Sequence, residues 1–369
     1  MGRTQGQGGR RIDLPVVAVA ALIGGSLPGQ SPGASRAAET RAVVEQVGAA
    51  RLRVVADEAD AALAVIRAPT PEAADQAWQR VRASEGYWAL RVREAAFHRS
   101  VTDSAFRAFL RSDSTARRAP ALEATLTRWR HADIRESVRR AAAYLPPGTA
   151  FHATLYFEVK PRLNTFVFKT DSGPSIFVAD DPSIGAASFE NEIAHELHHI
   201  GYEAACPGLD TSQATPLASV TTWMGAFGEG WAMLAAAGGP DVYPHAGDDS
   251  SARATWDRNY GNVAADLAQL DRFFTDILDR RVTNRDTVTA RAMSFFGTVQ
   301  GPWYTVGYLM TRTVEKAHGH AALMATLCHP TQLVLRYQRT ARAQDAAGGH
   351  LPLWSDALIQ HLRRATAKR

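Results

Sequence analysis

The sequence predicts an α+β fold that is predominantly α-helical, and three observations support this prediction. Apolar residues recur at helical spacing through most of the 369-residue chain. One short block, residues 151–179, instead alternates apolar and polar residues as β-strands do. The pattern H-E-x-x-H follows that block at His195 to His199, in a helical run without proline. We therefore expect a small β-sheet beside the H-E-x-x-H helix.

The composition is that of a globular protein, with 46% hydrophobic and 21% charged residues. The net charge is only +4, and the basic residues are dispersed among acidic ones and form no stripe. This distribution argues against nucleic-acid binding. The two cysteines, Cys206 and Cys328, form no C-x-x-C pair, which excludes a cysteine-built zinc site. They could form one disulfide in an exported protein, but the sequence does not decide this.

Residues 1–38 have the pattern of an export signal. Basic residues at Arg3, Arg10 and Arg11 precede an apolar run over residues 14–23, and small residues follow. About ten apolar residues are too few to span a bilayer, so we expect no stable membrane span in the mature chain. The predicted location is periplasmic or secreted. The alternative is a disordered N-terminal tail on a cytoplasmic protein.

Residues 39–148 are rich in Ala, Arg, Glu and Leu, with apolar residues at helical spacing, for example Val54, Ala61 and Val65. Turn-forming residues interrupt this region at 69–71 and at 146–148. We predict four or five helices in this region. They would form the wall of a cleft beside the H-E-x-x-H helix and contribute no catalytic residue. Residues 149–369 would hold the catalytic region, in one continuous domain with these helices.

Three strands are predicted at residues 151–159, 164–170 and 175–179, separated by turn-forming residues. A sheet with an exposed edge beside the next helix would let a peptide add as an extra strand. An ordinary small sheet covering that helix explains the pattern equally well. Further helices are predicted over residues 216–237, 260–280 and 302–317, the last beginning at Pro302.

His195 and His199 would lie about 40° apart on one face of a helix, where two imidazoles can share a metal ion. Glu196 would flank that face, beside the open coordination position of the metal ion. A base that activates a metal-bound water must lie there. A solvated amphipathic helix that happens to carry histidines is the alternative. His198 is expected to be a structural hydrogen-bonder, and Asn191 is a weaker candidate for orienting a ligand.

A catalytic zinc usually takes three protein ligands, so a third ligand is expected downstream of His199. The candidates are Glu203, Asp210, Glu229, Asp241 and His245. Glu203 would point past the metal, and His245 lies on the most flexible-looking loop. Glu229 stands in a second apolar helix, and its neighbours Gly228 and Gly230 would let that helix approach the first closely. Glu229 is therefore the predicted third ligand.

Tyr304 and Tyr308 are four residues apart on the helix begun by Pro302, so they share a face. We predict that one or both donate a hydrogen bond to the oxyanion of a hydrolytic reaction. Two aromatic residues at helical spacing are, however, more often part of a core.

Two sets of residues carry a resemblance to known families. His195-Glu-Leu-His-His199 with Gly228-Glu229-Gly230-Trp-Ala232 resembles the gluzincin metallopeptidases, whose third ligand is a glutamate on a following helix. Residues 84–88, 302–310 and 315–319 resemble a family of uncharacterised bacterial zinc-dependent peptidases, and the likeness spans about residues 50–340. It implies a zincin-like catalytic domain with one Zn²⁺ on His195, His199 and Glu229, and Glu196 as base. The metzincin pattern is not met, because Tyr202 and Ala205 stand where it needs Gly and His.

The expected function is hydrolysis of peptide bonds in a peptide or protein substrate, by a zinc-activated water with Glu196 as general base. The alternative is a non-catalytic, zinc-stabilised exported binding protein. Glu196 favours the enzyme, because a purely structural site needs no base. Cleavage specificity, endo- or exopeptidase action and oligomeric state do not follow from the sequence.

Overall fold

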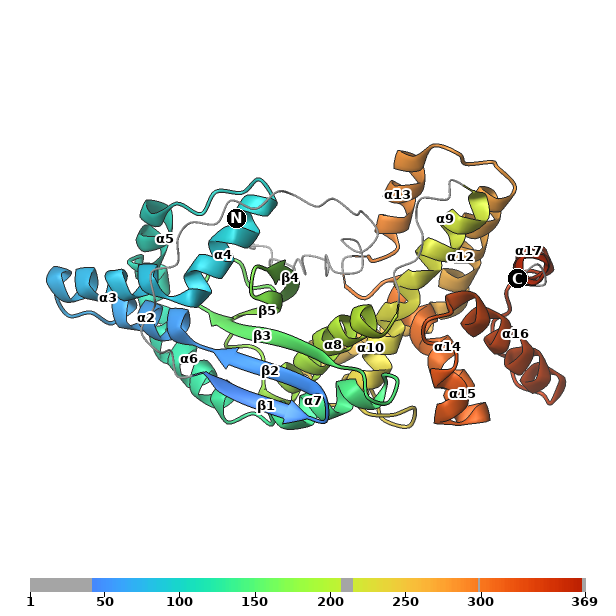
Figure 1. Ribbon diagram of the computed structural model, residues 1–369, viewed down its shortest axis with the longest axis horizontal. Coiled ribbons are helices and arrows are strands. Elements are labelled where there is room, and N and C mark those ends of the chain that lie inside the picture. Colours follow the sequence, from blue (N-terminus) through green and yellow to red (C-terminus); the bar gives the residue numbers. More distant parts are fainter. Residues whose placement is uncertain (1–41, 207–214, 298, 367–369) are drawn as a thin grey trace, which may run out of the picture.

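The computed structural model describes residues 42–206, 215–297 and 299–366. The predicted export signal and the candidate Asp210 lie outside these ranges. The molecule is elongated, with a β-sheet and its covering helices at one end and a bundle of helices at the other (Figure 1). Helices α8 (Ala186–Ala205) and α10 (Gly228–Ala237) lie side by side between the two ends. The H-E-x-x-H helix is thus at the junction of the two halves.

The sheet has five strands in the order β1-β2-β3-β5-β4. The strands are β1 (Val43–Val47), β2 (Ala50–Val55), β3 (Phe151–Glu158), β4 (Phe166–Thr170) and β5 (Gly173–Ala179). The central strands β2, β3 and β5 are parallel, whereas the edge strands β1 and β4 are antiparallel to their neighbours. The three strands predicted from the sequence are therefore confirmed, with small shifts of their ends.

Strands β1 and β2 correct the expectation that residues 39–148 are helical throughout. Val54, read from the sequence as part of a helical stripe, lies in β2 and pairs with Leu155 of β3. The two strands form a hairpin whose turn contains Gly48 at φ 58°. The valines of both strands favour extended backbone because they are β-branched. The sheet consequently draws on both parts of the chain.

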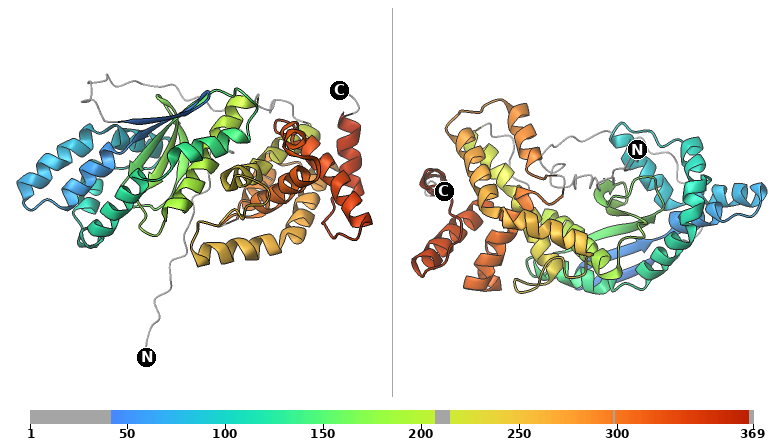
Figure 2. Two further views of the ribbon diagram at one scale, coloured as in Figure 1. Left: turned by 90° about the horizontal axis from the view of Figure 1, so that it is seen from below. Right: turned by 180° about the vertical axis from the view of Figure 1, so that it is seen from behind.

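The helices of this half are α2 (Asp57–Ile66), α3 (Pro71–Ala83), α4 (Glu85–Ala96), α5 (Asp103–Leu110), α6 (Asp113–Arg130) and α7 (Ile134–Ala143). Helices α6, α7 and α8 cover one face of the sheet, which Figure 2 (left) shows nearly edge-on. There Trp129 of α6 stacks on Phe189 of α8 at 4.6 Å between ring centroids, and both contact Phe157 of β3. This aromatic contact fixes α8, and with it the H-E-x-x-H motif, against the sheet.

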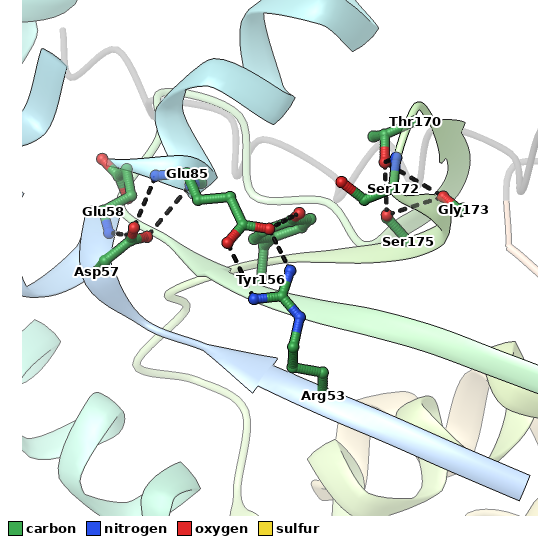
Figure 3. Close-up of polar contacts among 10 residues, drawn as sticks. Arg53, Asp57, Glu58, Glu85, Tyr156, Thr170, Ser172, Gly173 and Ser175 are labelled. Atoms are coloured by element: carbon green, nitrogen blue, oxygen red, sulfur yellow. Dashed lines mark hydrogen bonds and ion pairs between the residues drawn. The ribbon is translucent and has the colours of Figure 1, made fainter. Parts of the chain in front are cut away.

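Helix α4 covers the opposite face, where a polar network anchors it (Figure 3). The Glu85 carboxylate accepts hydrogen bonds from Arg53 of β2 and, at 2.7 Å, from the Tyr156 hydroxyl of β3. The Asp57 carboxylate accepts from the backbone N–H groups of Glu85 and Gly86 at the start of α4. This network serves the fold, because it joins two strands to one helix.

The other half is a helical bundle. Its helices are α9 (Pro216–Met224), the short 3₁₀-helix η1 (Gly225–Phe227), α11 (Ser250–Gly261), α12 (Val263–Leu278), α13 (Arg285–Ser294), α14 (Pro302–His318), α15 (His320–Met324), α16 (Pro330–Ala346) and α17 (Asp356–Thr366). Helix α14 begins at Pro302, as predicted. Cys206, at the end of α8, forms a disulfide with Cys328, between α15 and α16. No helix in the described part of the chain is long and apolar enough to cross a membrane.

Candidate metal site

Three side chains from α8 and α10 converge on one point. The Nε2 atoms of His195 and His199 are 3.0 Å apart, and they lie 3.2 and 3.1 Å from Oε2 of Glu229. These three form the one group of potential metal ligands within 4.8 Å of each other found among the described residues. Helical geometry places the two histidines on one face, and α10 supplies the carboxylate from beside it.

The spacing of the three donor atoms fits a zinc ion. Tetrahedral zinc with bonds of about 2.0–2.1 Å holds its ligands about 3.3 Å apart, close to the separations observed. Glu229 is fully buried, and its Oε1 has no hydrogen-bond partner among the described residues. Oε2 of Glu196, a residue that is 6% exposed, has no partner among them either. Buried polar atoms are rarely left unpaired in a folded protein. A cation at this point, with a water beside it, would satisfy them.

The ionisation of the site also suits metal binding. Burial alone would raise the pKa of Glu229, but His199 and His195 lower it to about 2, so the ligand is a carboxylate at neutral pH. Burial lowers the pKa of His195, which favours the neutral imidazole that a metal requires. Burial also acts to lower the pKa of His199, but the Glu229 carboxylate outweighs it and raises that pKa in the metal-free protein. Burial raises the pKa of Glu196 to about 8 in the metal-free protein. The surroundings of Glu229 and Glu196 thus hold the two carboxyl groups of one site in different protonation states in the metal-free protein.

A comparison of the sequence with known protein families identifies the family of this chain. Residues 73–346 match the family described as "Putative zinc dependent peptidase (DUF5700)". The chain belongs to this family. No curated protein and no solved structure matches the chain significantly. The resemblance inferred from residues 84–88, 302–310 and 315–319 is therefore confirmed at the level of the family, whose name states zinc dependence and peptidase activity.

In this family member, the position of α10 depends on a close helix contact that differs from the one expected. A Cβ added to Gly230 would lie 2.0 Å from the backbone of Gly307 in α14, whereas one added to Gly228 would meet open space. The sequence suggested that the glycines let α10 approach α8 closely. This prediction is wrong, because neither glycine contacts α8 in this way. Gly230 lets α10 pack against α14, and Glu229 then faces α8 from the neighbouring side of the helix.

Arg140 of α7 ties the two ligand-bearing helices together. Its guanidinium donates at 2.5 Å to the Asn191 side chain in α8 and at 2.6 Å to the Ala236 carbonyl in α10. Asn191 also donates to the carbonyl of Pro244. Asn191, considered from the sequence as a residue that orients a ligand, is thus placed where it joins helices and a loop.

The two predicted tyrosines lie in different surroundings. The Tyr304 ring stacks on His195 at 6.1 Å, and burial followed by the nearby Glu229 and Glu196 carboxylates holds its pKa well above the usual range. Tyr308 contacts Trp256 and Tyr260, and its hydroxyl donates to the Val242 carbonyl at 3.4 Å. The structure thus brings Tyr304 to the site and places Tyr308 beneath a loop.

His198 points away from the metal ligands' shared centre. Its Nε2 is 3.2 Å from the Tyr144 carbonyl, and its ring stacks on Trp231 of α10. Burial lowers the pKa of His198 to about 3, so the ring is neutral. The structural role expected from the sequence is confirmed by these contacts.

His245 is more buried than its place in a loop predicts. His245, considered and set aside as a loop residue, is only 7% exposed and affects the pKa of His195 electrostatically. Its Nδ1 lies 2.6 Å from the Asp248 carboxylate. The spacing of a histidine and an aspartate three residues apart was the available signal, but it is common in loops and has no specificity alone.

Proposed function

We propose that this protein is an exported zinc-dependent peptidase in which His195, His199 and Glu229 hold one Zn²⁺ and Glu196 is the general base. The observation that carries the proposal is the convergence of three buried donor atoms at 3.0–3.2 Å, with Oε2 of Glu196 one residue from His195 and without a hydrogen-bond partner among the described residues. A structural zinc site has four closed protein ligands and no base. Three ligands and a base fit a hydrolytic site better.

With zinc held by His195, His199 and Glu229, the site would supply Lewis-acid chemistry that polarises the substrate carbonyl and lowers the pKa of the attacking water. Glu196 accepts the proton of the attacking water and then delivers it to the leaving amine, so the reaction consumes no net proton at this residue. In the metal-free protein, burial raises the pKa of Glu196, so its carboxylate takes up a proton more readily than an exposed one does. Tyr304, beside Glu229 and Glu196, is the better placed of the two tyrosines to donate to the oxyanion.

The edge strand β4 is the proposed docking place for the peptide. It pairs only with β5 in the sheet order, which leaves its other side without a strand neighbour among the described residues. Thr165, just before β4, hydrogen bonds to Glu192 of α8, one turn before Glu196. An extended peptide paired with β4 would therefore run past the metal site.

Export is part of the proposal. The disulfide between Cys206 and Cys328 supports it, because such bonds persist in oxidising compartments outside the cytoplasm. Fractionation of cells producing the full chain, with N-terminal sequencing of the mature protein, tests it. Recovery of an uncleaved chain with reduced cysteines in the cytoplasm would refute this part.

The central test is the Glu196→Gln variant. Hydrolysis of casein or a quenched peptide library should fall by about 10²–10⁴-fold, while zinc per molecule stays at the wild-type level. Glu203→Gln is the matched control, because it replaces an exposed carboxylate on the same helix by an amide. This variant should keep full activity. Equal activity of the Glu196→Gln and wild-type proteins would rule out the mechanism. Full zinc occupancy with no hydrolysis by the wild type would favour the binding protein.

A further inference from the structure

Gln300 has a backbone conformation that glutamine rarely adopts. Its φ angle is 47°, in the left-handed region where an L side chain crowds the following carbonyl oxygen. Two other non-glycine residues in the described part of the chain share this region, His98 and Arg280, and each is the second residue after a helix. A left-handed residue is common at that position. Gln300 instead precedes α14, so helix termination does not explain its conformation.

The segment that joins α13 to α14 is held firmly around Gln300. The Asn259 side chain of α11 donates to the Val299 carbonyl at 2.7 Å and to the Gln300 carbonyl at 3.3 Å. The N–H of Gly301 donates to the Phe296 carbonyl at 2.8 Å, and a Cβ added to Gly301 would lie 2.8 Å from that same oxygen. Surroundings of this kind hold a residue in a conformation that costs free energy, and such residues are concentrated at binding and catalytic sites.

The side chain of Gln300 makes only a weak contact with the described residues. Its one hydrogen bond to them runs from Nε2 to Sδ of Met233 at 3.7 Å, and a thioether sulfur is a weak acceptor. The residue is partly exposed. A glycine would take up this backbone conformation without strain, as Gly297 does at φ 69° in the same segment. The glutamine side chain therefore contributes little to the loop, and its amide is available to another partner.

Gln300 lies one helical turn from residues of the candidate metal site. Met233, which its amide contacts, follows Glu229 by four residues on α10. Gln300 itself precedes Tyr304 by four residues, and the Tyr304 ring stacks on His195. In Figure 1, the segment between α13 and α14 lies on the same upper side of α8 and α10 as strand β4. The loop and the edge strand thus stand over one side of the two helices that carry the candidate ligands.

A peptide paired with β4 has backbone groups left for such an amide. Along an extended strand, the N–H and C=O groups of successive residues point to opposite edges, so a single partner strand pairs with every second residue. The residues between them direct their N–H and C=O groups away from β4. A primary amide carries both a donor and an acceptor, so it can pair with one such residue as a backbone would.

We propose that Gln300 is a substrate-binding residue. Its amide donates to the carbonyl and accepts from the N–H of one substrate residue beside the scissile bond, on the edge of the peptide opposite β4. Both bonds are to the backbone, so the contact selects an extended peptide without selecting its side chains. No covalent bond changes at Gln300, and the same hydrogen bonds are present in the bound substrate and in the transition state. The inference deepens the proposed peptidase function and rests on it.

The first test is Gln300→Gly in the zinc-loaded full chain, with the quenched peptide that the wild type cleaves fastest. Loss of the amide should raise KM by about 10-fold and leave kcat within about twofold, because the bonds it made are equally present in bound substrate and transition state. Relief of the left-handed conformation should raise the melting temperature by about 1–3 °C. A lower melting temperature would overturn the proposal, because it would show that the side chain supports the loop.

Two further variants separate the amide from the backbone. Gln300→Glu keeps the shape and the left-handed conformation but replaces the donor by a carboxylate oxygen, so KM should rise while the melting temperature stays at the wild-type value. Arg280→Gly removes a left-handed side chain (φ 59°) at the exposed end of α12, so the melting temperature should rise while KM stays unchanged. A rise in KM as large as that of Gln300→Gly would overturn the proposal, because it would attribute the effect to the backbone change.

The failure of this inference differs from failure of the proposed function. If the wild type neither cleaves nor binds peptides, the peptidase proposal itself is wrong, and the role of Gln300 is refuted with it. If the wild type cleaves peptides and both Gln300→Gly and Gln300→Glu match it in KM, only the role of Gln300 is refuted. Loss of zinc from either variant would also refute this role, because the amide would then act on the metal site and not on the substrate.

Discussion

Two regions of this molecule bury several ionisable side chains, and they differ in how those groups meet. At the metal site, donor atoms of His195, His199 and Glu229 converge on one point. A second set, the strand-end cluster of Glu58, Glu158, Lys160 and Asp180, lies where β2, β3 and β5 end. There, Nζ of Lys160 is 3.5 Å from Glu158 and 4.1 Å from the Phe166 ring.

The two regions share the properties usually taken to mark functional sites. Burial raises the pKa of Glu158 to about 7, just as it raises that of Glu196 to about 8, and both regions contain unpaired buried oxygens. In the strand-end cluster, however, Lys160 supplies the opposite charge from within the protein. At the candidate metal site, the converging donor atoms leave room for a cation to supply the opposite charge. Convergence of donors, more than burial or shifted pKa values, therefore identifies the site.

The Glu229→Ala variant tests most directly whether the candidate metal site and the strand-end cluster differ in metal binding. Removing a ligand should weaken zinc binding by more than about 1,000-fold, beyond the 10–100-fold cost of losing a supporting residue, and abolish hydrolysis. Glu158→Gln, the matched change in the strand-end cluster, should leave zinc binding unchanged. Competition with a chromogenic chelator measures both. Full zinc retention in Glu229→Ala would move the third ligand elsewhere.

Lys160→Met should have the next largest effect, on stability and not on zinc. Removing one partner of a buried ion pair leaves Glu158 unpaired and should lower the free energy of unfolding by about 3–5 kcal/mol. Adding Glu158→Gln should recover part of this loss. Urea denaturation in excess zinc provides the measurement. A Lys160→Met protein as stable as wild type would show that the pair contributes nothing.

Asp180→Asn tests the strand-end cluster through pH. Burial raises the pKa of Asp180 from 3.8 to about 7, so between these values the unfolded chain ionises while the folded protein keeps its proton. The wild type should therefore lose stability as pH rises through this window. The variant should be more stable than wild type by about 2–4 kcal/mol at pH 8 and no more stable at pH 4. A difference independent of pH would contradict the burial of an ionisable group here.

Gly230→Ala should have the smallest effect and connects the metal site to the packing behind it. The added methyl group must push α10 away from Gly307 in α14, at a cost of about 1–3 kcal/mol, and the shift should also weaken zinc binding through Glu229. Gly228→Ala, with open space around it, is the control. Calorimetric unfolding with and without zinc separates the two effects; identical behaviour of both variants would refute the close contact.

Much of the site followed from local rules of the sequence. The helical period places His195 and His199 together, and Pro302 marks the start of α14. Strands β1 and β2 could not be recognised in the same way, because β2 is stabilised by pairing with β3, about a hundred residues away. Propensity is a weak guide where long-range pairing decides.

The position of His245 was beyond local rules for a similar reason. Its loop carries no periodic pattern, and its place is fixed by side chains from α8, α11 and α14 that are distant in sequence. The role of the glycines around Glu229 was misread on the same grounds. A glycine indicates that something comes close, but the sequence does not say which helix that is.

The disulfide between Cys206 and Cys328 has a consequence for survival among other peptidases. The 122 positions it spans include Glu229, His245 and Tyr304, whereas His195 and His199 lie just outside, on the chain leading into Cys206. A single cut in any exposed loop between the cysteines would leave all of these residues on one covalently joined particle. Such a nicked protein would run as two fragments on a reducing gel and as one on a non-reducing gel. A cut between Cys206 and Glu229 would thus separate the two histidines from Glu229 only after reduction.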